Sequence, residues 1–170
     1  MGLGLYLEIQ SGREGMSDAE FVSDMKKTVA CCCRMAKGTV SSMSDERADG
    51  YVNTYVRDSW FSSVDAVVEL KKNFNANFSG VVKTNHSRYP KKRLEHTMKE
   101  WPPGSHLVLQ AKYEGVVMFG CGQKYNKRKV CCFIFNKEGR CYEAKCKDEN
   151  SNTMTRDAPH PHVISKYLVT

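Results

Sequence analysis

The chain has 170 residues, which is enough for one domain with a hydrophobic core but too few for two full domains. Hydrophobic residues make up 41% of it and charged residues 26%, the usage of ordinary soluble proteins, which argues against wholesale disorder. We find no signal peptide and no apolar run near the length of a membrane span, so we expect an intracellular, soluble protein without a membrane partner. The net charge of +7 favours nucleic acid as a partner, and a basic face in water is the alternative.

Two elements are predicted at the start of the chain. Residues 3–9 alternate apolar with other side chains, which predicts a strand with one buried face. Ser17 and Glu20 have the spacing of a capping box, and apolar residues recur every three or four positions after them, which predicts an amphipathic helix that ends near Gly38. Residues 39–50 are rich in Ser and Asp and are predicted to form a loop.

A carboxylate stands at the end of the next predicted strand. Residues 51–57 combine aromatic and β-branched types that favour a strand, and Asp58 follows it directly. Ser62 with Asp65 resembles a capping box that begins a helix over 62–72. Ligands of open α/β sheets gather at the carboxyl ends of strands, so Asp58 is a candidate metal ligand. An Asp before a helix can equally serve as its N-terminal cap, and that interpretation stays open.

Basic residues cluster after a further strand, which the alternation predicts over residues 78–83. Pro90 suits the first turn of a helix, which we expect over residues 91–100. Two interpretations of the cluster stay open: its side chains grip DNA phosphates near the strand end, or they form the solvated face of a short surface helix. The cluster consists of His86, Arg88, Lys91, Lys92 and Arg93.

The second half of the chain has the pattern of antiparallel strands. We expect them over 107–112, 116–121, 130–135 and 140–145, followed by a polar loop over 148–161 and a helix after it. The turn between the second and third strands is strongly basic, which suits a DNA contact, a weak nuclear-import patch or a charged tip that prevents edge-to-edge aggregation. Its basic residues are Lys124, Lys127, Arg128 and Lys129.

The eight cysteines are expected to stay reduced, because an intracellular protein seldom keeps stable disulfides. The adjacent residues Cys31–Cys33 lie in a predicted helix and point in different directions, so they cannot form one ligand set, and most thiols are expected to act as small buried hydrophobes. A zinc site is a further hypothesis, although paired Cys-x-x-Cys motifs are absent. It would use Cys141 and Cys146 with Cys121 and His160 or His162.

Several short blocks of the sequence carry a resemblance to a known family. They are Asp58-Ser59-Trp60-Phe61-Ser62-Ser63, Leu70-Lys71-Lys72, Ser79-Gly80-Val81-Val82-Lys83-Thr84-Asn85-His86 and Tyr89-Pro90-Lys91. In their order and spacing these blocks resemble the core of piggyBac-type DDE transposases. The chain is therefore similar to an internal fragment of the catalytic domain of these enzymes.

The resemblance implies an α/β fold with a partial RNase H-like core over 1–100, an antiparallel β insertion over 101–147, and a return loop with the start of the next core helix over 148–170. Intact relatives hold two Mg²⁺ ions with three Asp carboxylates for DNA cleavage and strand transfer. Asp58 matches the second of these, which implies a catalytic and metal-binding role. The resemblance also implies a DNA partner, a nuclear location and, in the intact family, a homodimer. The implied DNA contacts are Lys83, Arg88, Lys91, Lys92, Arg93, Lys127, Arg128 and Lys129.

The first and third carboxylates of the family pattern have no match, because the first is expected before Gly2 and the third beyond Thr170. We therefore expect a transposase fragment that is inactive by itself, and whether it is an enzyme stays open. The alternatives are a domesticated, non-catalytic nucleic-acid-binding protein derived from a transposon, and a zinc or thiol protein unrelated to transposons. Other acidic residues of the chain do not obviously replace the two unmatched carboxylates; they are Glu8, Asp45, Asp49 and Asp157.

Overall fold

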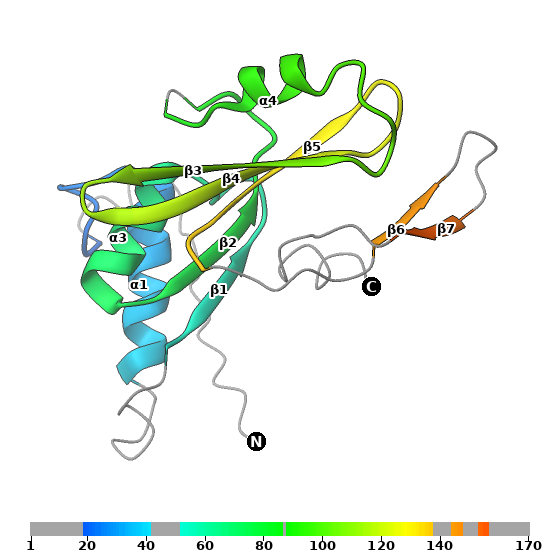
Figure 1. Ribbon diagram of the computed structural model, residues 1–170. Helices are drawn as coiled ribbons and strands as arrows, with labels where there is room; N and C mark the ends of the chain where they lie inside the picture. The colour runs from blue at the N-terminus through cyan, green and yellow to red at the C-terminus, as the bar shows by residue number, and fades with distance from the viewer. Residues whose placement is uncertain (1–18, 42–51, 87, 138–143, 148–152, 157–170) are drawn as a thin grey trace.

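The computed structural model describes residues 19–41, 52–86, 88–137, 144–147 and 153–156 of the chain, the last two ranges by their backbone alone. A five-stranded sheet is its centre, with strand order β1-β2-β5-β4-β3, and helices pack against it (Figure 1). None of the described helices has the length and hydrophobicity needed to cross a bilayer. The helices are α1 (Lys27–Ser41), α3 (Val64–Phe74) and α4 (Lys91–Thr97).

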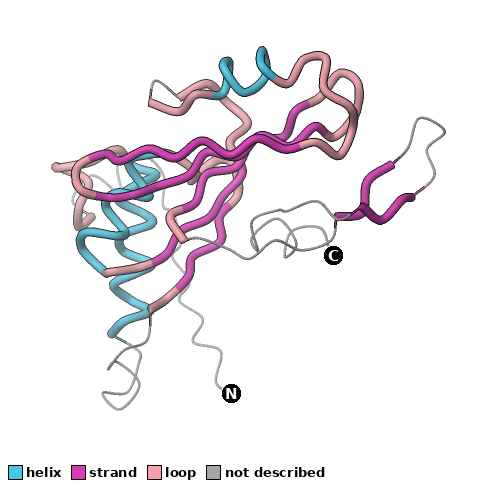
Figure 2. The backbone as a smooth tube through the Cα atoms, in the orientation of Figure 1, coloured by secondary structure: helices cyan, strands magenta, loops and turns pink. Residues whose placement is uncertain are grey.

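The sheet is mixed, and its strands come from both halves of the chain. Strands β1 and β2 are parallel, joined by α3, whereas β5 runs antiparallel to β2, and β4 and β3 continue the antiparallel order. A second sheet consists of two antiparallel strands, β6 and β7 (Figure 2). The strands are β1 (Thr54–Arg57), β2 (Asn77–Val81), β3 (His106–Tyr113), β4 (Val116–Lys124), β5 (Val130–Phe135), β6 (Ala144–Lys147) and β7 (Thr153–Arg156).

The three strands predicted over 107–135 are confirmed as antiparallel, and they extend the sheet that β1 and β2 begin. The hydrogen-bonded register places Gly80 of β2 opposite Ile134 of β5, so the junction lies in the middle of the sheet. Residues expected in the core and residues expected in the insertion therefore belong to one hydrogen-bonded sheet. The division into 1–100, 101–147 and 148–170 stays a prediction.

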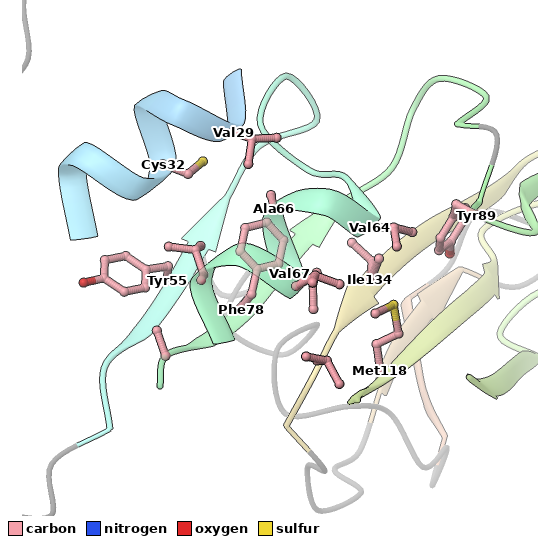
Figure 3. Close-up of a cluster of buried hydrophobic side chains, with 14 of the residues drawn as sticks. Val29, Cys32, Tyr55, Val64, Ala66, Val67, Phe78, Tyr89, Met118 and Ile134 are labelled. Atoms are coloured by element: carbon pink, nitrogen blue, oxygen red, sulfur yellow. The ribbon is translucent and has the colours of Figure 1, made fainter. Parts of the chain in front are cut away.

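The main core lies between α1 and α3 and one face of the sheet. Figure 3 shows Val29 of α1 and Val67 of α3 in one buried cluster with Phe78 of β2 and Ile134 of β5. Each of these four side chains is at most 1% exposed. Burying large apolar side chains against one another is the main favourable contribution to folding, which explains why the helices adopt this position.

A smaller cluster lies on the other face of the sheet. Because strand side chains alternate between faces, the register that pairs Phe119 with Phe135 and Cys121 with Phe133 collects all four there. The rings of Phe119 and Phe135 stack with centroids 5.4 Å apart. The alternation of strands β4 and β5 therefore produces two apolar faces.

Two predicted boundaries at helix starts are wrong. Residues 19–24 form turns rather than the first helical turns, and α1 begins at Lys27 and continues to Ser41. Phe21 adopts a φ of 69°, a left-handed conformation that cannot continue an α-helix. In α3 the N-cap is Ser63, whose hydroxyl accepts from the Ala66 amide at 3.1 Å, so the predicted capping box is displaced by one residue.

One predicted loop contains a strand. Residues 153–156 form β7, paired with β6, where a polar loop over 148–161 was expected. Thr153 and Thr155 are β-branched residues that suit an extended backbone, and pairing with β6 supplies their hydrogen bonds. The predicted strand over 3–9, most of the predicted loop over 39–50 and the helix expected after Pro161 lie outside the described residues.

Candidate functional site

Asp58 and the basic cluster emerge at the same edge of the sheet. Strands β1 and β2 are parallel and Arg57 pairs with Gly80, so the residues that follow each strand share one edge. In Figure 1 both arrows point toward the end of the sheet where α4 lies. We call this edge the basic end, which consists of Asp58 and residues 83–100 and 124–129. The carboxyl ends of parallel strands are where α/β proteins usually place their ligands.

The carboxylate of Asp58 is exposed and partly engaged by its own turn. Its Oδ1 accepts a hydrogen bond from the Trp60 amide at 3.0 Å. In the described part of the chain its other oxygen, Oδ2, accepts no hydrogen bond. Asp58 therefore stabilises the turn before α3, whereas Ser63 caps the helix.

Ser62 fixes the backbone that carries Asp58. Its hydroxyl is fully buried and donates to the Asp58 carbonyl at 2.6 Å. This close packing depends on Gly80 of β2, because a Cβ at position 80 would lie 1.9 Å from the Ser62 hydroxyl oxygen. Because glycine has no Cβ, the turn that contains Ser62 can pack directly against β2 at Gly80.

The described residues supply one metal-ligand candidate rather than a complete set. No group of three His, Cys, Asp or Glu side chains that could hold a metal ion lies within the parts of the chain that the structure describes. Asp65, the next carboxylate, is occupied by Lys26 at 2.9 Å and Arg88 at 2.5 Å. Mg²⁺ is commonly held by one or two carboxylates with waters and phosphate oxygens, so Asp58 fits as a single ligand.

Two of the predicted DNA-binding side chains, those of Arg88 and Lys91, are held in place by contacts with the protein. Arg88 binds Asp65 and stacks over the ring of Tyr113 at 4.9 Å. Lys91 donates to the Lys83 carbonyl at 2.6 Å and lies 3.4 Å from Glu95. These contacts join the loop after β2 to the start of α4 and to α3, while Arg88 stays half exposed at 50%. The side chains of Lys92 and Arg93 on α4 are exposed.

The β4–β5 turn extends the basic end. Val81 lies opposite Phe133, so β5 begins at the edge where β2 ends, and Lys127, Arg128 and Lys129 precede it as exposed residues. Lys124 is an exception: it was expected among the basic residues of the turn, but it is 3% exposed. Its side chain lies on the same face of β4 as those of Val116 and Met118, and its Nζ donates to the Lys99 carbonyl at 2.6 Å.

Charge is concentrated at this edge. Residues 83–100 and 124–129 contain ten Lys and Arg against two acidic residues, while the other residues contain 16 against 17. The +7 charge of the chain therefore comes from the basic end, and the remainder is nearly neutral. Two exposed members of this region, Lys99 and Tyr125, and the adjoining exposed Trp101 were not expected from the sequence, because they are separated along the chain.

The thiols of the described core are buried and poorly ionised. Burial raises the pKa of Cys32 to about 11 and that of Cys121 to about 12. Cys31, Cys32 and Cys33 are all buried, which confirms the expectation that they act as small hydrophobes. Of the residues in the zinc hypothesis, Cys121 has a described side chain, and it is fully buried. The side chains of the others, Cys141, Cys146, His160 and His162, are not described by the structure.

Comparison with known proteins decides the family. The sequence profile of the transposase IS4 family, a DDE family, matches residues 23–169. The chain belongs to this family. A search of curated proteins finds no match. The structure is similar to the cryo-EM structure of a piggyBac transposase synaptic complex with hairpin DNA, with a TM-score of 0.56 and 14% identity. The similarity covers 89% of this chain and 26% of that one.

The comparisons confirm two expectations from the sequence. The resemblance to piggyBac-type DDE transposases is confirmed, and the mixed α/β structure has the RNase H-like DDE fold. DDE transposases generally use divalent metal ions. The chain spans about a quarter of the length of the piggyBac transposase chain.

Proposed function

We propose that this chain forms part of a DDE transposase catalytic domain, with DNA bound at the basic end and Asp58 acting there as one ligand of Mg²⁺. The observation that carries the proposal is the coincidence in space of two independent features. The strand-end carboxylate and the concentrated positive charge share the edge at which β1 and β2 end. Nucleic-acid phosphates would be attracted to this edge, where a carboxylate-held ion could meet them.

Asp58 would contribute one oxygen to the ion. A bound Mg²⁺ polarises a phosphate oxygen and stabilises the charge that develops during phosphodiester cleavage. The protein's own part is positional: the Trp60 amide holds Oδ1, and Ser62 holds the Asp58 carbonyl. These bonds orient the carboxylate before any ion binds, which lowers the cost of assembling the site.

DNA would contact the exposed cations of the basic end. Lys83, Lys92, Arg93, Lys127, Arg128 and Lys129 are exposed. Arg88 and Lys91 shape the loop after β2 and keep part of their charge at the surface. Contacts of this kind are sequence-independent and weaken with salt because they release counterions. The nuclear location and the homodimer of intact relatives are part of the same proposal.

A second candidate function is DNA binding without cleavage, as in a domesticated protein derived from a transposon. The concentration of charge favours it as strongly as it favours catalysis, because phosphate binding needs no metal ion. Under both candidates the residues expected as core and insertion act together, since β5 pairs directly with β2.

The experiment is a charge-matched comparison of two double variants. Lys92→Gln/Arg93→Gln removes two charges from the basic end, and Lys71→Gln/Lys112→Gln removes two charges elsewhere on the surface. Fluorescence anisotropy with a labelled DNA duplex is measured across a series of salt concentrations. We expect the first pair to reduce the slope of log affinity against log salt by about 2, since each phosphate contact contributes roughly 0.9.

The control pair should leave that slope nearly unchanged, and thermal melting of each variant shows whether it is folded. Equal losses in the two variants would mean that net charge, rather than the basic end, attracts DNA. Binding of the unaltered chain that is absent or insensitive to salt would refute both candidate functions.

A further inference from the structure

Two loops that are far apart in sequence form one surface within the basic end and at the adjoining Trp101. The buried side chain of Lys124 donates from Nζ to the Lys99 carbonyl at 2.6 Å. The backbone of the same residue bonds Gly104 and Ser105, each at 2.8 Å. These three bonds fasten the β4–β5 turn to the loop that follows α4. We call the resulting surface the tip surface, which consists of Lys99, Trp101, Tyr125, Lys127, Arg128 and Lys129.

The turn has a fixed shape. Tyr125 donates its amide to the Lys129 carbonyl at 2.9 Å, which closes the turn across its base. The Asn126 side chain accepts from the amides of Arg128 and Lys129 at 3.0 and 2.8 Å. A surface that is already ordered loses little conformational freedom on binding, so its contacts contribute fully to affinity.

The tip surface exposes aromatic rings among its cations. Tyr125 is 55% exposed and Trp101 is 37% exposed. The Lys129 ammonium lies 5.8 Å from the centre of the Tyr125 ring, and Lys99 lies 3.9 Å from Glu100. Exposed aromatic rings interleaved with basic side chains are the features by which proteins bind single strands, because bases stack on the rings while cations hold the phosphates.

We propose that the tip surface binds unpaired nucleotides, with bases stacked on Tyr125 and Trp101 and phosphates held by Lys127, Arg128 and Lys129. This proposal rests on the proposed function and adds a DNA form that it prefers. In a duplex the faces of the bases are covered by their neighbours, so ring stacking is available only where the strand is single or distorted. The basic side chains alone would not distinguish single-stranded from duplex DNA, whereas the rings of Tyr125 and Trp101 would, because they need an uncovered base on which to stack.

The first test uses the two tryptophans of the chain, Trp60 and Trp101. The variant Trp60→Phe leaves Trp101 as the only indole. Its fluorescence is titrated with an oligothymidylate of about 16 nucleotides, the upper site size of small single-strand binding folds. We expect quenching of Trp101 as a base stacks on it. A saturable binding curve by anisotropy without any change in Trp101 emission would overturn the proposal.

The second test compares Tyr125→Ala with Tyr125→Phe, which keeps the ring and the charge of the surface. Tyr125→Ala should weaken oligothymidylate binding roughly tenfold, within the range for loss of one stacked base, and should change duplex binding far less. Tyr125→Phe should bind like the unaltered chain. Equal affinities of Tyr125→Ala and Tyr125→Phe for the oligothymidylate, or equal losses for both DNA forms, would overturn the proposal.

The outcomes separate this proposal from the function on which it rests. Salt-dependent duplex binding that depends on Lys92 and Arg93, together with oligothymidylate binding that ignores Tyr125, removes only the tip-surface proposal. If the unaltered chain shows no salt-dependent DNA binding, both the tip-surface proposal and the proposed function are refuted.

Discussion

Asp58 performs two tasks with one carboxyl group. Oδ1 closes the turn that leads into α3 by accepting from the Trp60 amide at 3.0 Å, and the group stays exposed at the edge where β1 ends. The bond holds the carboxylate in one orientation, which is the property that a metal ligand needs. A structural role in the turn and a role in metal binding are therefore compatible at this residue.

At the residue scale we predict that Asp58→Asn weakens Mn²⁺ binding to the DNA-bound chain by at least roughly tenfold, a loss reported even for residues that only support metal ligands. The amide keeps the turn's hydrogen bond, because its oxygen still accepts from Trp60, but it lacks the negative charge. Electron paramagnetic resonance of free Mn²⁺ measures the affinity. Glu69→Gln, on α3, is the matched control, and an Asp58→Asn variant with undiminished Mn²⁺ affinity would exclude this carboxylate as a ligand.

At the element scale, the position of α3 depends on how closely its preceding turn approaches β2. The Ser62 hydroxyl occupies the space that a side chain at position 80 would need. The helix itself is well delimited: Ser63 caps its start, and Asn75 ends it in a left-handed conformation with a φ of 46°. Asp65 in its first turn binds Lys26 and Arg88, which attaches α3 to the loop after β2.

We therefore predict that Gly80→Ala lowers the free energy of unfolding by about 2 kcal/mol, the usual cost of overfilling a packed site. Urea denaturation followed by circular dichroism measures it. Ser62→Ala/Gly80→Ala removes the hydroxyl but leaves a Cβ 3.0 Å from the new methyl group, so the double variant should recover part of the loss. Strict additivity of the two single changes would show that Ser62 and Gly80 do not share this space.

At the scale of the whole molecule, the charge and the thiols are segregated. The positive charge gathers at the basic end, whereas the thiols of Cys32, Cys33, Cys121 and Cys132 are buried in the two clusters of the sheet. Burial raises their pKa values, to about 11 for Cys32 and Cys132 and about 12 for Cys33 and Cys121. Burial also raises the pKa of Tyr89, whose hydroxyl donates to the Phe133 carbonyl at 2.8 Å.

These shifts predict how stability depends on alkaline pH. The unfolded chain releases its thiol protons near pH 9, while the folded chain keeps them until about pH 11 to 12, so the folded state binds more protons in between. The stability that these thiols contribute should therefore be fully present below pH 9 and be lost as the pH rises from 9 through about 11 to 12. Urea titrations under reducing conditions from pH 7 to about pH 11 measure this. Cys121→Ala should make the decline shallower, and a parallel decline would mean that other groups cause it.

Much of the local organisation could be predicted from the sequence. Strand-forming residue types identified the strand that became β1, strand-like patterns identified β2, β3, β4 and β5, and Pro90 marked the start of α4. Asp58 was found because a strand-forming run ends immediately before it, and the basic clusters are visible as runs of Lys and Arg. These features depend on neighbours along the chain, which is why the order of residues contains them.

The tertiary structure decided which of these features meet. The pairing of β5 with β2, the burial of Lys124 and the attachment of the Lys99 carbonyl to the β4–β5 turn each join residues that are distant in sequence. The local pattern also misplaced the start of α1, where Phe21 has a left-handed φ, and the cap of α3, where the Ser62 hydroxyl bonds the Asp58 carbonyl and Ser63 caps the helix. Such contacts arise from non-local hydrogen bonding and burial, whose partners are chosen only when the whole sheet assembles.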